Sequence, residues 1–312
     1  MDVDAVFEGS GVSPGSLSPD LRLPFPDLLD LLERAARISG FPHIGLLLGL
    51  RFDLTSHHGL IGALMQTAPT LKQALVDFAT WQPGYSSGAI VYLNRLGDEY
   101  ELGYGTYAVS SPGTRVLYDL VVGVGSCMVR QLTGGSVGPI EAHFTHGAEE
   151  DGAIYGRLLR MPARFNQPRT GVILQAAAMG TAPPGSDPLE RQRLLKIIED
   201  AAWTTRPDFA TKVSRAIRHH LHYDGPTLPA VAGELGLHPR TLRRRLHDEG
   251  QTFERLRDEV RFAVARELLE LSGIPVAEVG AFLGFEAPGV FSRAYRRWSG
   301  TSPSNWRQGK RT

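Results

Sequence analysis

Apolar residues in the first third of the chain recur every three or four positions, which is the period of an α-helix. The predicted helices cover residues 27–38, 43–50, 59–65 and 70–81. In the last of these, Leu71, Leu75 and Phe78 form the apolar stripe, and Thr70 stands where it can cap the first turn. The pattern therefore predicts a set of short amphipathic helices.

After residue 88 the pattern becomes an alternation of apolar and polar residues, which is typical of β-strands. The predicted strands cover residues 89–95, 99–107, 139–146, 164–166 and 170–175, and the helices between them cover 114–132 and 151–160. Gly97 and Asp98 mark a hairpin turn between the first two strands. This order predicts an α+β domain with helices over a mainly antiparallel sheet.

The last hundred residues contain a weak internal repeat, VAGELGLHPRTLRRRL at 231–246 and VGAFLGFEAPGVFSRAY at 279–295. Each copy has an apolar–small pair, then a glycine followed by an apolar residue, and then two apolar residues four positions apart. A short helix that ends at glycine, followed by a second anchored helix, is a helix-turn-helix, whose second helix is shaped for the DNA major groove. Two copies, joined by a long predicted helix over 252–271, favour an all-α DNA-binding domain with two such motifs.

The last hundred residues also differ from the rest of the chain in net charge. Residues 206–312 carry 18 of the 33 Lys and Arg but 12 of the 33 Asp and Glu, a net of +6, which leaves a net of −6 for the rest. A basic half is the natural candidate for contact with a nucleic acid.

These patterns divide the chain into four segments. We expect a flexible tail at 1–24, an α+β sensor or oligomerisation domain at 25–180, a linker with a helix at 181–205 and the helix-turn-helix domain at 206–312. The linker helix has three interpretations: it bridges the domains, packs on its own domain, or pairs with its copy in a dimer.

Composition limits the classes of protein to which this chain can belong. A single cysteine, Cys127, excludes an intramolecular disulfide framework and a cysteine-rich zinc site. The N-terminus has no hydrophobic signal region, and the apolar runs are too short to span a bilayer. We therefore expect a cytoplasmic protein that does not contact a membrane.

No enzyme motif is present in the sequence. HExxH, Walker and GxGxxG spacings are missing and no GxSxG nucleophile elbow is predicted, so we expect no catalytic residue and no cofactor. His219, His220 and His222 offer a metal site as one interpretation, but imidazoles near a helix C-terminus are favoured electrostatically and explain them better. His143 and His146 lie on a predicted strand without a cysteine nearby, so we expect no metal there.

The C-terminal hundred residues resemble the DNA-binding domain of the AraC/XylS family of bacterial transcription regulators. The matching stretches are VAGELGLHPRTLRRRLHDEGQTF and VGAFLGFEAPGVFSRAYRRWSGTSPSNWR, and Trp298, Gly300, Pro303 and Arg307 come close to the family's signature. The resemblance implies seven helices, with two helix-turn-helix units joined by a rigid helix.

The N-terminal portion more loosely resembles the sensor domain of a subgroup of these regulators that is named after arabinose binding. The matching stretches are GLIGALMQTAPTLKQAL at 59–75, PIEAHFTH at 139–146 and FNQP at 165–168. The resemblance implies a small-molecule effector, although the name does not establish arabinose as the ligand.

When the arginine-rich stretch of the first repeat is placed on an α-helix, its side chains fall on distinct faces of that helix. Leu242 and Leu246 fall on the core side, and the opposite side carries the candidate base-reading residues, with one arginine on the flank. The candidate DNA contacts are Arg240, Thr241, Arg243, Arg244 and His247, with Arg245 on the flank as a phosphate contact or a partner for an acidic neighbour. Arginine pairs bidentately with guanine, so Arg240, Arg243 and Arg244 are the candidates for direct base contact.

The second repeat differs from the first at the start of its recognition helix. Ala287, Pro288 and Gly289 offer no side-chain hydrogen bonds there, although this family often has polar residues at these positions. The remaining candidate contacts are Ser292, Arg293, Arg296 and Arg297. We therefore expect the first unit to read bases and the second to hold the backbone, contact a thymine methyl or read DNA shape.

Aromatic residues of the N-terminal half are the candidates for an effector pocket. They are Trp81, Tyr85, Tyr92, Tyr104, Tyr107 and Phe144. Core or dimer contacts are an equally good interpretation of these side chains, and nothing in the sequence identifies a ligand.

The sequence thus predicts a transcription regulator, by resemblance more often an activator, that is controlled by a small effector of unknown identity. Its expected partners are double-stranded promoter DNA, RNA polymerase and a second copy in a homodimer. The alternative is a ligand-independent architectural or interaction protein that uses the same DNA-binding domain.

Overall fold

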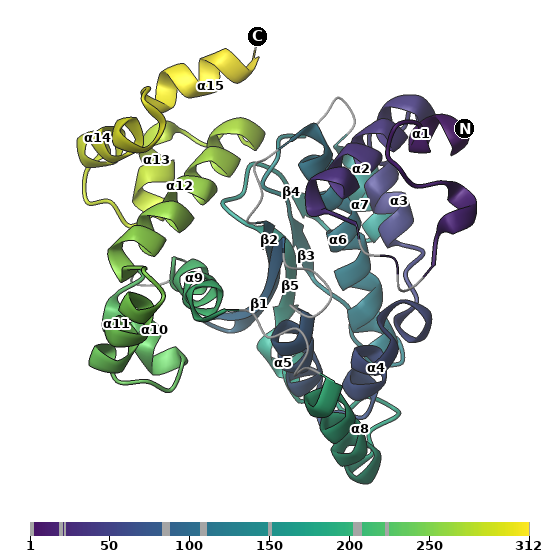
Figure 1. Ribbon diagram of the computed structural model, residues 1–312. Coiled ribbons are helices and arrows are strands. Elements are labelled where there is room, and N and C mark those ends of the chain that lie inside the picture. The colour runs from purple at the N-terminus through teal and green to yellow at the C-terminus, as the bar shows by residue number, and fades with distance from the viewer. Residues whose placement is uncertain are drawn as a thin grey trace. The chain divides into compact units, whose positions relative to one another are not determined.

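The computed structural model describes residues 3–18, 21, 23–82, 88–106, 111–148, 152–201, 208–221 and 225–311. The chain divides into two compact units, unit 1 (residues 1–205) and unit 2 (residues 206–312). Unit 2 is the group of helices after residue 206, which run from mid-green to yellow in Figure 1. None of the helices in the described ranges combines the length and apolarity needed to cross a bilayer.

Unit 1 is an α+β domain, as the sequence predicts. Its helices are α1 (Val3–Phe7), α2 (Phe25–Ser39), α3 (Ile44–Gly49), α4 (Leu54–Gln66), α5 (Leu71–Trp81), α6 (Pro112–Leu132), α7 (Ala153–Leu159) and α8 (Pro188–Ala201), with 3-10 turns η1 (Pro14–Ser16) and η3 (Ala176–Gly180). Its strands are β1 (Ala89–Leu96), β2 (Glu99–Thr106), β3 (Glu141–His143), β4 (Ala163–Arg164) and β5 (Thr170–Gln175).

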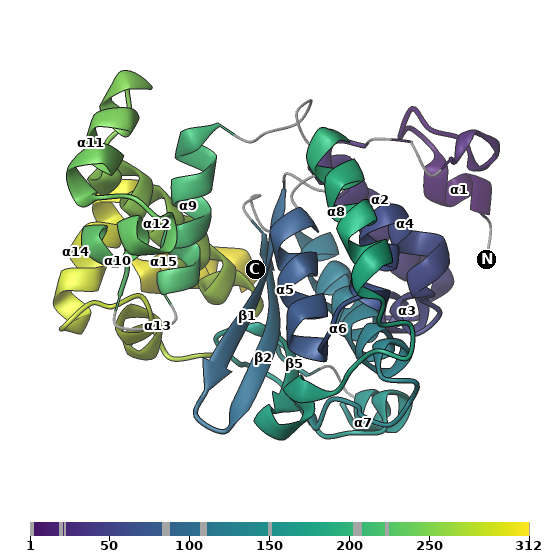
Figure 2. The same ribbon diagram turned by 90° about the horizontal axis from the view of Figure 1, so that it is seen from below.

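The five strands form one sheet in the order β1-β2-β5-β3-β4. Every neighbouring pair is antiparallel except β3 and β4, which are parallel. Gly97 takes a positive φ of 62° in the hairpin turn between β1 and β2, a conformation that glycine adopts without steric cost. Helices α5 and α6 pack on one face of the sheet (Figure 2), and most of unit 1's core lies between these layers.

Two segments of unit 1 differ from the sequence-based expectation. The first 24 residues, expected to be a flexible tail, contain α1, in which the side chain of Val6 is buried. The strand predicted over 139–146 is shorter, because His146 leaves the ladder and turns into the core toward Asp119.

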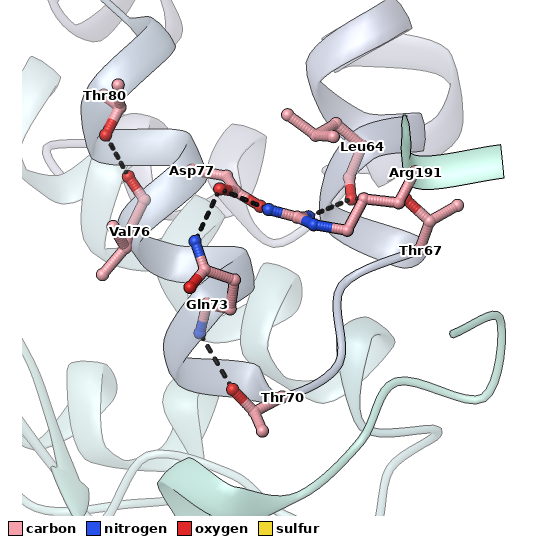
Figure 3. Close-up of polar contacts among 8 residues, drawn as sticks. All are labelled: Leu64, Thr67, Thr70, Gln73, Val76, Asp77, Thr80 and Arg191. Carbon is pink, nitrogen blue, oxygen red and sulfur yellow. Dashed lines mark hydrogen bonds and ion pairs between the residues drawn. The ribbon is translucent and has the colours of Figure 1, made fainter. Parts of the chain in front are cut away.

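Helix α8 packs on unit 1, which was one of three interpretations of the linker helix. Leu194 and Ile198 are buried against Leu64 of α4. The Arg191 guanidinium binds both carboxylate oxygens of Asp77 on α5, at 2.6 and 2.9 Å, and Gln73 Nε2 donates to the same carboxylate (Figure 3). A bidentate pair with little exposure to water fixes both position and direction, so α8 is anchored to α4 and α5.

Unit 2 is all-α, and its described residues form seven helices, the number that the family resemblance implies. They are α9 (Phe209–His220), α10 (Leu228–Glu234), α11 (Pro239–Asp248), α12 (Phe253–Leu271), α13 (Val276–Phe282), α14 (Pro288–Ser299) and α15 (Pro303–Arg311). The predicted connecting helix is α12, and the Thr252 side chain caps it by accepting a hydrogen bond from the backbone N–H of Arg255 at 3.2 Å.

Candidate nucleic-acid interface

Two helix-turn-helix units, α10–α11 and α13–α14, close their turns in the same way. Gly236 and Gly284 follow the first helix of each unit with φ of 64° and 77°. The backbone N–H of the next residue then donates back into the helix, from Leu237 to Ala232 O at 2.8 Å and from Phe285 to Gly280 O at 3.0 Å. This repeated closure is the Schellman-type hydrogen bond of a glycine-terminated helix, and it redirects the chain into the recognition helix.

Helix α11 separates its apolar and basic residues onto opposite sides. Leu242 and Leu246 are completely buried in the core of unit 2, whereas Arg240, Arg243, Arg244 and His247 are exposed and Thr241 is half-buried. None of the three arginines forms an ion pair within the described residues. Their guanidinium groups therefore remain available for an anionic partner, and their contact with DNA stays a prediction.

Arg245 lies on the flank of α11, and its guanidinium stands 5.6 Å from the ring centre of Phe209 on α9. The Glu249 carboxylate, just after α11, accepts hydrogen bonds from the backbone N–H groups of Phe209 and Ala210 at the start of α9, at 3.2 and 3.0 Å. Sequence reasoning missed these contacts, because the groups involved lie about 40 residues apart in the chain. Together they join the end of α11 to α9.

The basic residues of α14 have two different environments. Arg297 binds Asp258 of α12 at 2.6 Å and so is engaged within unit 2. Arg293 and Arg296 are exposed and form no ion pair with a described residue, and the half-buried Ser292 lies beside them in a shallow hollow. All three predicted α14 arginines are therefore exposed, but only Arg293 and Arg296 lack an ion pair with a described residue.

The two histidines at the end of α9 converge on one carboxylate. His219 Nδ1 and His220 Nε2 lie 2.8 and 2.9 Å from the same oxygen of Glu234 on α10. Burial is the largest influence on His220 and lowers its pKa. Among the described residues this is the only group of three side chains spaced closely enough to share a metal ion, and His222 lies outside those residues.

His143 and His146 each contact an acidic side chain, which sequence reasoning missed. His143 Nε2 lies 2.7 Å from Glu141, and His146 Nε2 lies 3.0 Å from the fully buried Asp119. The Tyr155 hydroxyl donates to the second oxygen of Asp119 at 2.9 Å. This network ties α6 to α7 and to the segment after β3, so His146 has a structural role in the core.

Unit 1 contains a partly open cavity of about 360 Å³ between its helices and its sheet. Of the aromatic residues predicted to line a pocket, Tyr104 does so, whereas Tyr92 and Phe144 are buried and Trp81 packs against the core. Tyr85 and Tyr107 lie outside the described residues. His57 and Gln82 also line the cavity, and no local pattern marks them, because the walls come from segments far apart in the sequence.

Comparison with known proteins supports the assignment of both units. Residues 1–182 match the family model of the arabinose-binding domain of AraC transcription regulator, N-terminal, and residues 231–309 match a helix-turn-helix domain. The ornithine utilization regulator of Pseudomonas aeruginosa is 26% identical over 324 residues, which cover 97% of this chain and 90% of that protein. The transcriptional activator NphR of Rhodococcus sp. is 30% identical over 182 residues, covering 57% and 53% of the two chains.

Among solved structures, the transcriptional regulator CdpR from Pseudomonas aeruginosa aligns with 93% of this chain and 99% of that chain, at a TM-score of 0.46 and 19% identity. The first family model alone spans more than half of the sequence, and the second covers both helix-turn-helix units. The chain is therefore a member of the AraC family of DNA-binding transcription regulators, with the arabinose-binding type of N-terminal domain.

Proposed function

We propose that this regulator binds specific promoter sequences through α11 and α14, and that a small molecule bound in unit 1 controls this binding. The observation that carries the proposal is the exposed face of α11. Arg240, Arg243 and Arg244 share this face without an ion pair to any described residue, and the opposite face is buried. Such a helix can present guanidinium groups to guanine edges in the major groove.

The two recognition helices contribute unequally in this proposal. Both begin with proline, so Arg240, Arg243 and Arg244 of α11 correspond to Gly289, Ser292 and Arg293 of α14. Only one of the three arginine positions is retained in α14. Helix α11 then supplies most of the direct base contacts, and α14 holds the phosphate backbone and offers the exposed Val290 side chain to a thymine methyl group.

Activation of transcription through RNA polymerase is the proposed outcome of binding, and the relative NphR is itself named a transcriptional activator. A homodimer is the proposed assembly, since paired half-sites are common among helix-turn-helix regulators. The competing function is a ligand-independent architectural protein. Thermal unfolding against a panel of metabolites separates the two, because an effector must raise the unfolding temperature of the state that it binds.

Substitution of single arginines tests the unequal use of the two helices. Once genome-wide mapping has supplied a binding site, Arg244→Ala should relax the preference at one base position by about 1–3 kcal/mol, because one bidentate contact is lost. Arg293→Ala should weaken binding to all sequences alike and lower its salt dependence. The measurements are the affinity for a set of single-base variants at one salt concentration, and the affinity for the mapped site over a range of salt concentrations.

Arg255→Ala is the matched control, since Arg255 is an exposed arginine on α12 that pairs with Glu259. It should leave base preference unchanged. If Arg293→Ala relaxed base preference more than Arg244→Ala did, the proposed division between α11 and α14 would be wrong.

A further inference from the structure

The wall of the unit 1 cavity is made mainly of apolar side chains. Helix α6 contributes Leu117, Val121, Val124 and Met128, which recur every three or four residues and so share one face. Val121 and Val124 are only half-buried although α6 lies in the core, because this face borders the cavity. Strands β1, β2 and β5 and helices α2, α4 and α5 supply the remaining walls.

Three polar side chains of the described residues reach this cavity. Gln82, after α5, is 7% exposed, and its Oε1 has no hydrogen-bond partner among the described residues. The Tyr104 hydroxyl also makes no hydrogen bond within those residues, and burial raises its pKa, so it stays a neutral donor. His57 is exposed and already contacts the backbone of Asp53 through Nδ1. A buried amide oxygen without a partner is uncommon, and here it borders a space that a ligand can fill.

The described walls of the cavity offer no fixed charge to an ionic ligand. None of these lining residues is Lys, Arg, Asp or Glu, and the one imidazole, His57, is exposed and contacts the backbone of Asp53. A buried ion without a partner is strongly disfavoured. A sugar is also a poor match, since each buried hydroxyl needs a hydrogen-bond partner and the walls offer few. The volume of about 360 Å³ lies at the lower end of the range for small-molecule sites.

We infer that the effector of this regulator is a neutral, largely apolar molecule with one or two hydrogen-bonding groups that meet Gln82 and Tyr104, and not a sugar. The inference rests on the proposed function, because it identifies the chemical class of the effector that function requires.

The test is a fluorescence titration of the full chain with N-phenyl-1-naphthylamine, a neutral apolar fluorophore. Decan-1-ol should displace it, decanoate should do so at least tenfold more weakly because of its charge, and L-arabinose should not displace it. Val124→Phe, which fills the cavity, should weaken fluorophore binding at least tenfold. Val76→Phe is the matched control, because Val76 is 38% exposed on α5 and is not part of the cavity wall.

Gln82→Leu is a second variant for the case in which Val124→Phe does not fold. It should retain the fluorophore but make decan-1-ol a weaker competitor by about fivefold, the effect of one lost hydrogen bond. Displacement by L-arabinose or decanoate at least as strong as by decan-1-ol would overturn the inferred ligand class. Equal effects of Val124→Phe and Val76→Phe would overturn the assigned cavity.

A different measurement tests the proposed function. Fluorescence anisotropy of labelled promoter DNA reports whether decan-1-ol, at a concentration that fills the cavity, changes DNA affinity. An unchanged affinity with intact displacement would contradict effector control of DNA binding while the ligand class still holds.

Discussion

Single glycines determine how each helix-turn-helix unit is built. Gly236 takes a positive φ that side chains with a Cβ rarely adopt, although the space around it is open. Gly233, three residues earlier within α10, also has open space but an ordinary helical conformation. The two positions therefore differ only in backbone conformation, which makes them a matched pair.

We predict effects of opposite sign from the same substitution at these glycines. Gly236→Ala should lower the free energy of unfolding of unit 2 by about 1–2 kcal/mol, because alanine is strained in the left-handed region. Gly233→Ala should raise it by up to about 1 kcal/mol, because alanine is the better helix former. Hydrogen exchange of α12 amides in the full chain measures both changes in the free energy of unfolding. If Gly233→Ala lowered that free energy as much as Gly236→Ala does, this explanation would be contradicted.

The lowered pKa of His220 leads to a prediction about the stability of unit 2 in acid. Its pKa is lowered from the usual 6.5 by burial and by the neighbouring charge of His219, against the raising effect of Glu234. The unfolded chain therefore binds a proton more readily than the folded one, and stability is lost as the pH falls below about 6.5. His220→Gln, which stays neutral, should reduce that loss.

Urea unfolding at about pH 7.5 and about pH 5.5 measures this effect. The wild-type midpoint should fall more between the two pH values than the midpoint of the variant. The same fall in both proteins would show that another group governs the response.

At the level of elements, one buried ion pair adds to the apolar packing that holds α8 on unit 1. Arg191→Ala would leave Asp77 buried without its guanidinium partner, and the cost of such a loss is about 3–5 kcal/mol. Arg193, two residues away on the same helix, pairs with Glu190 in full contact with water. Arg193→Ala should therefore have no measurable effect. Hydrogen exchange of α8 amides, together with urea unfolding, compares the two variants directly. Similar exchange rates in both variants would show that the ion pair of Asp77 with Arg191 does not anchor α8.

The sequence predicted elements better than it predicted contacts between them. The periodicity of apolar residues identified the helices α2 to α7, the hairpin and both helix-turn-helix units, because each is encoded by neighbouring residues. The pairing of Asp77 with Arg191 joins residues 114 positions apart, and that of Asp119 with His146 joins residues 27 apart. No local pattern carries such pairings, and the same is true of the cavity, whose lining depends on how the segments pack.

At the level of the whole molecule, the two units carry opposite net charge, +6 for residues 206–312 and −6 for the rest. The acidic unit should weaken the long-range attraction between the full chain and any duplex. We predict that residues 206–312 alone bind a random duplex more tightly than the full chain does, and that added salt narrows the difference. Anisotropy titrations over a range of salt concentrations measure it, and equal affinities at low salt would contradict the prediction.

Helix α12 sets a fixed distance in unit 2. Its 19 residues extend about 28 Å at about 1.5 Å per residue, whereas successive major grooves on one face of straight DNA lie about 34 Å apart. A hydrogen-bonded helix does not stretch to close such a gap. We predict that a duplex that receives both α11 and α14 curves toward the protein, because α12, which joins the two motifs, is shorter than this groove spacing. On this prediction the stiffness of a promoter, and not its base sequence alone, decides whether it is held by one recognition helix or by two.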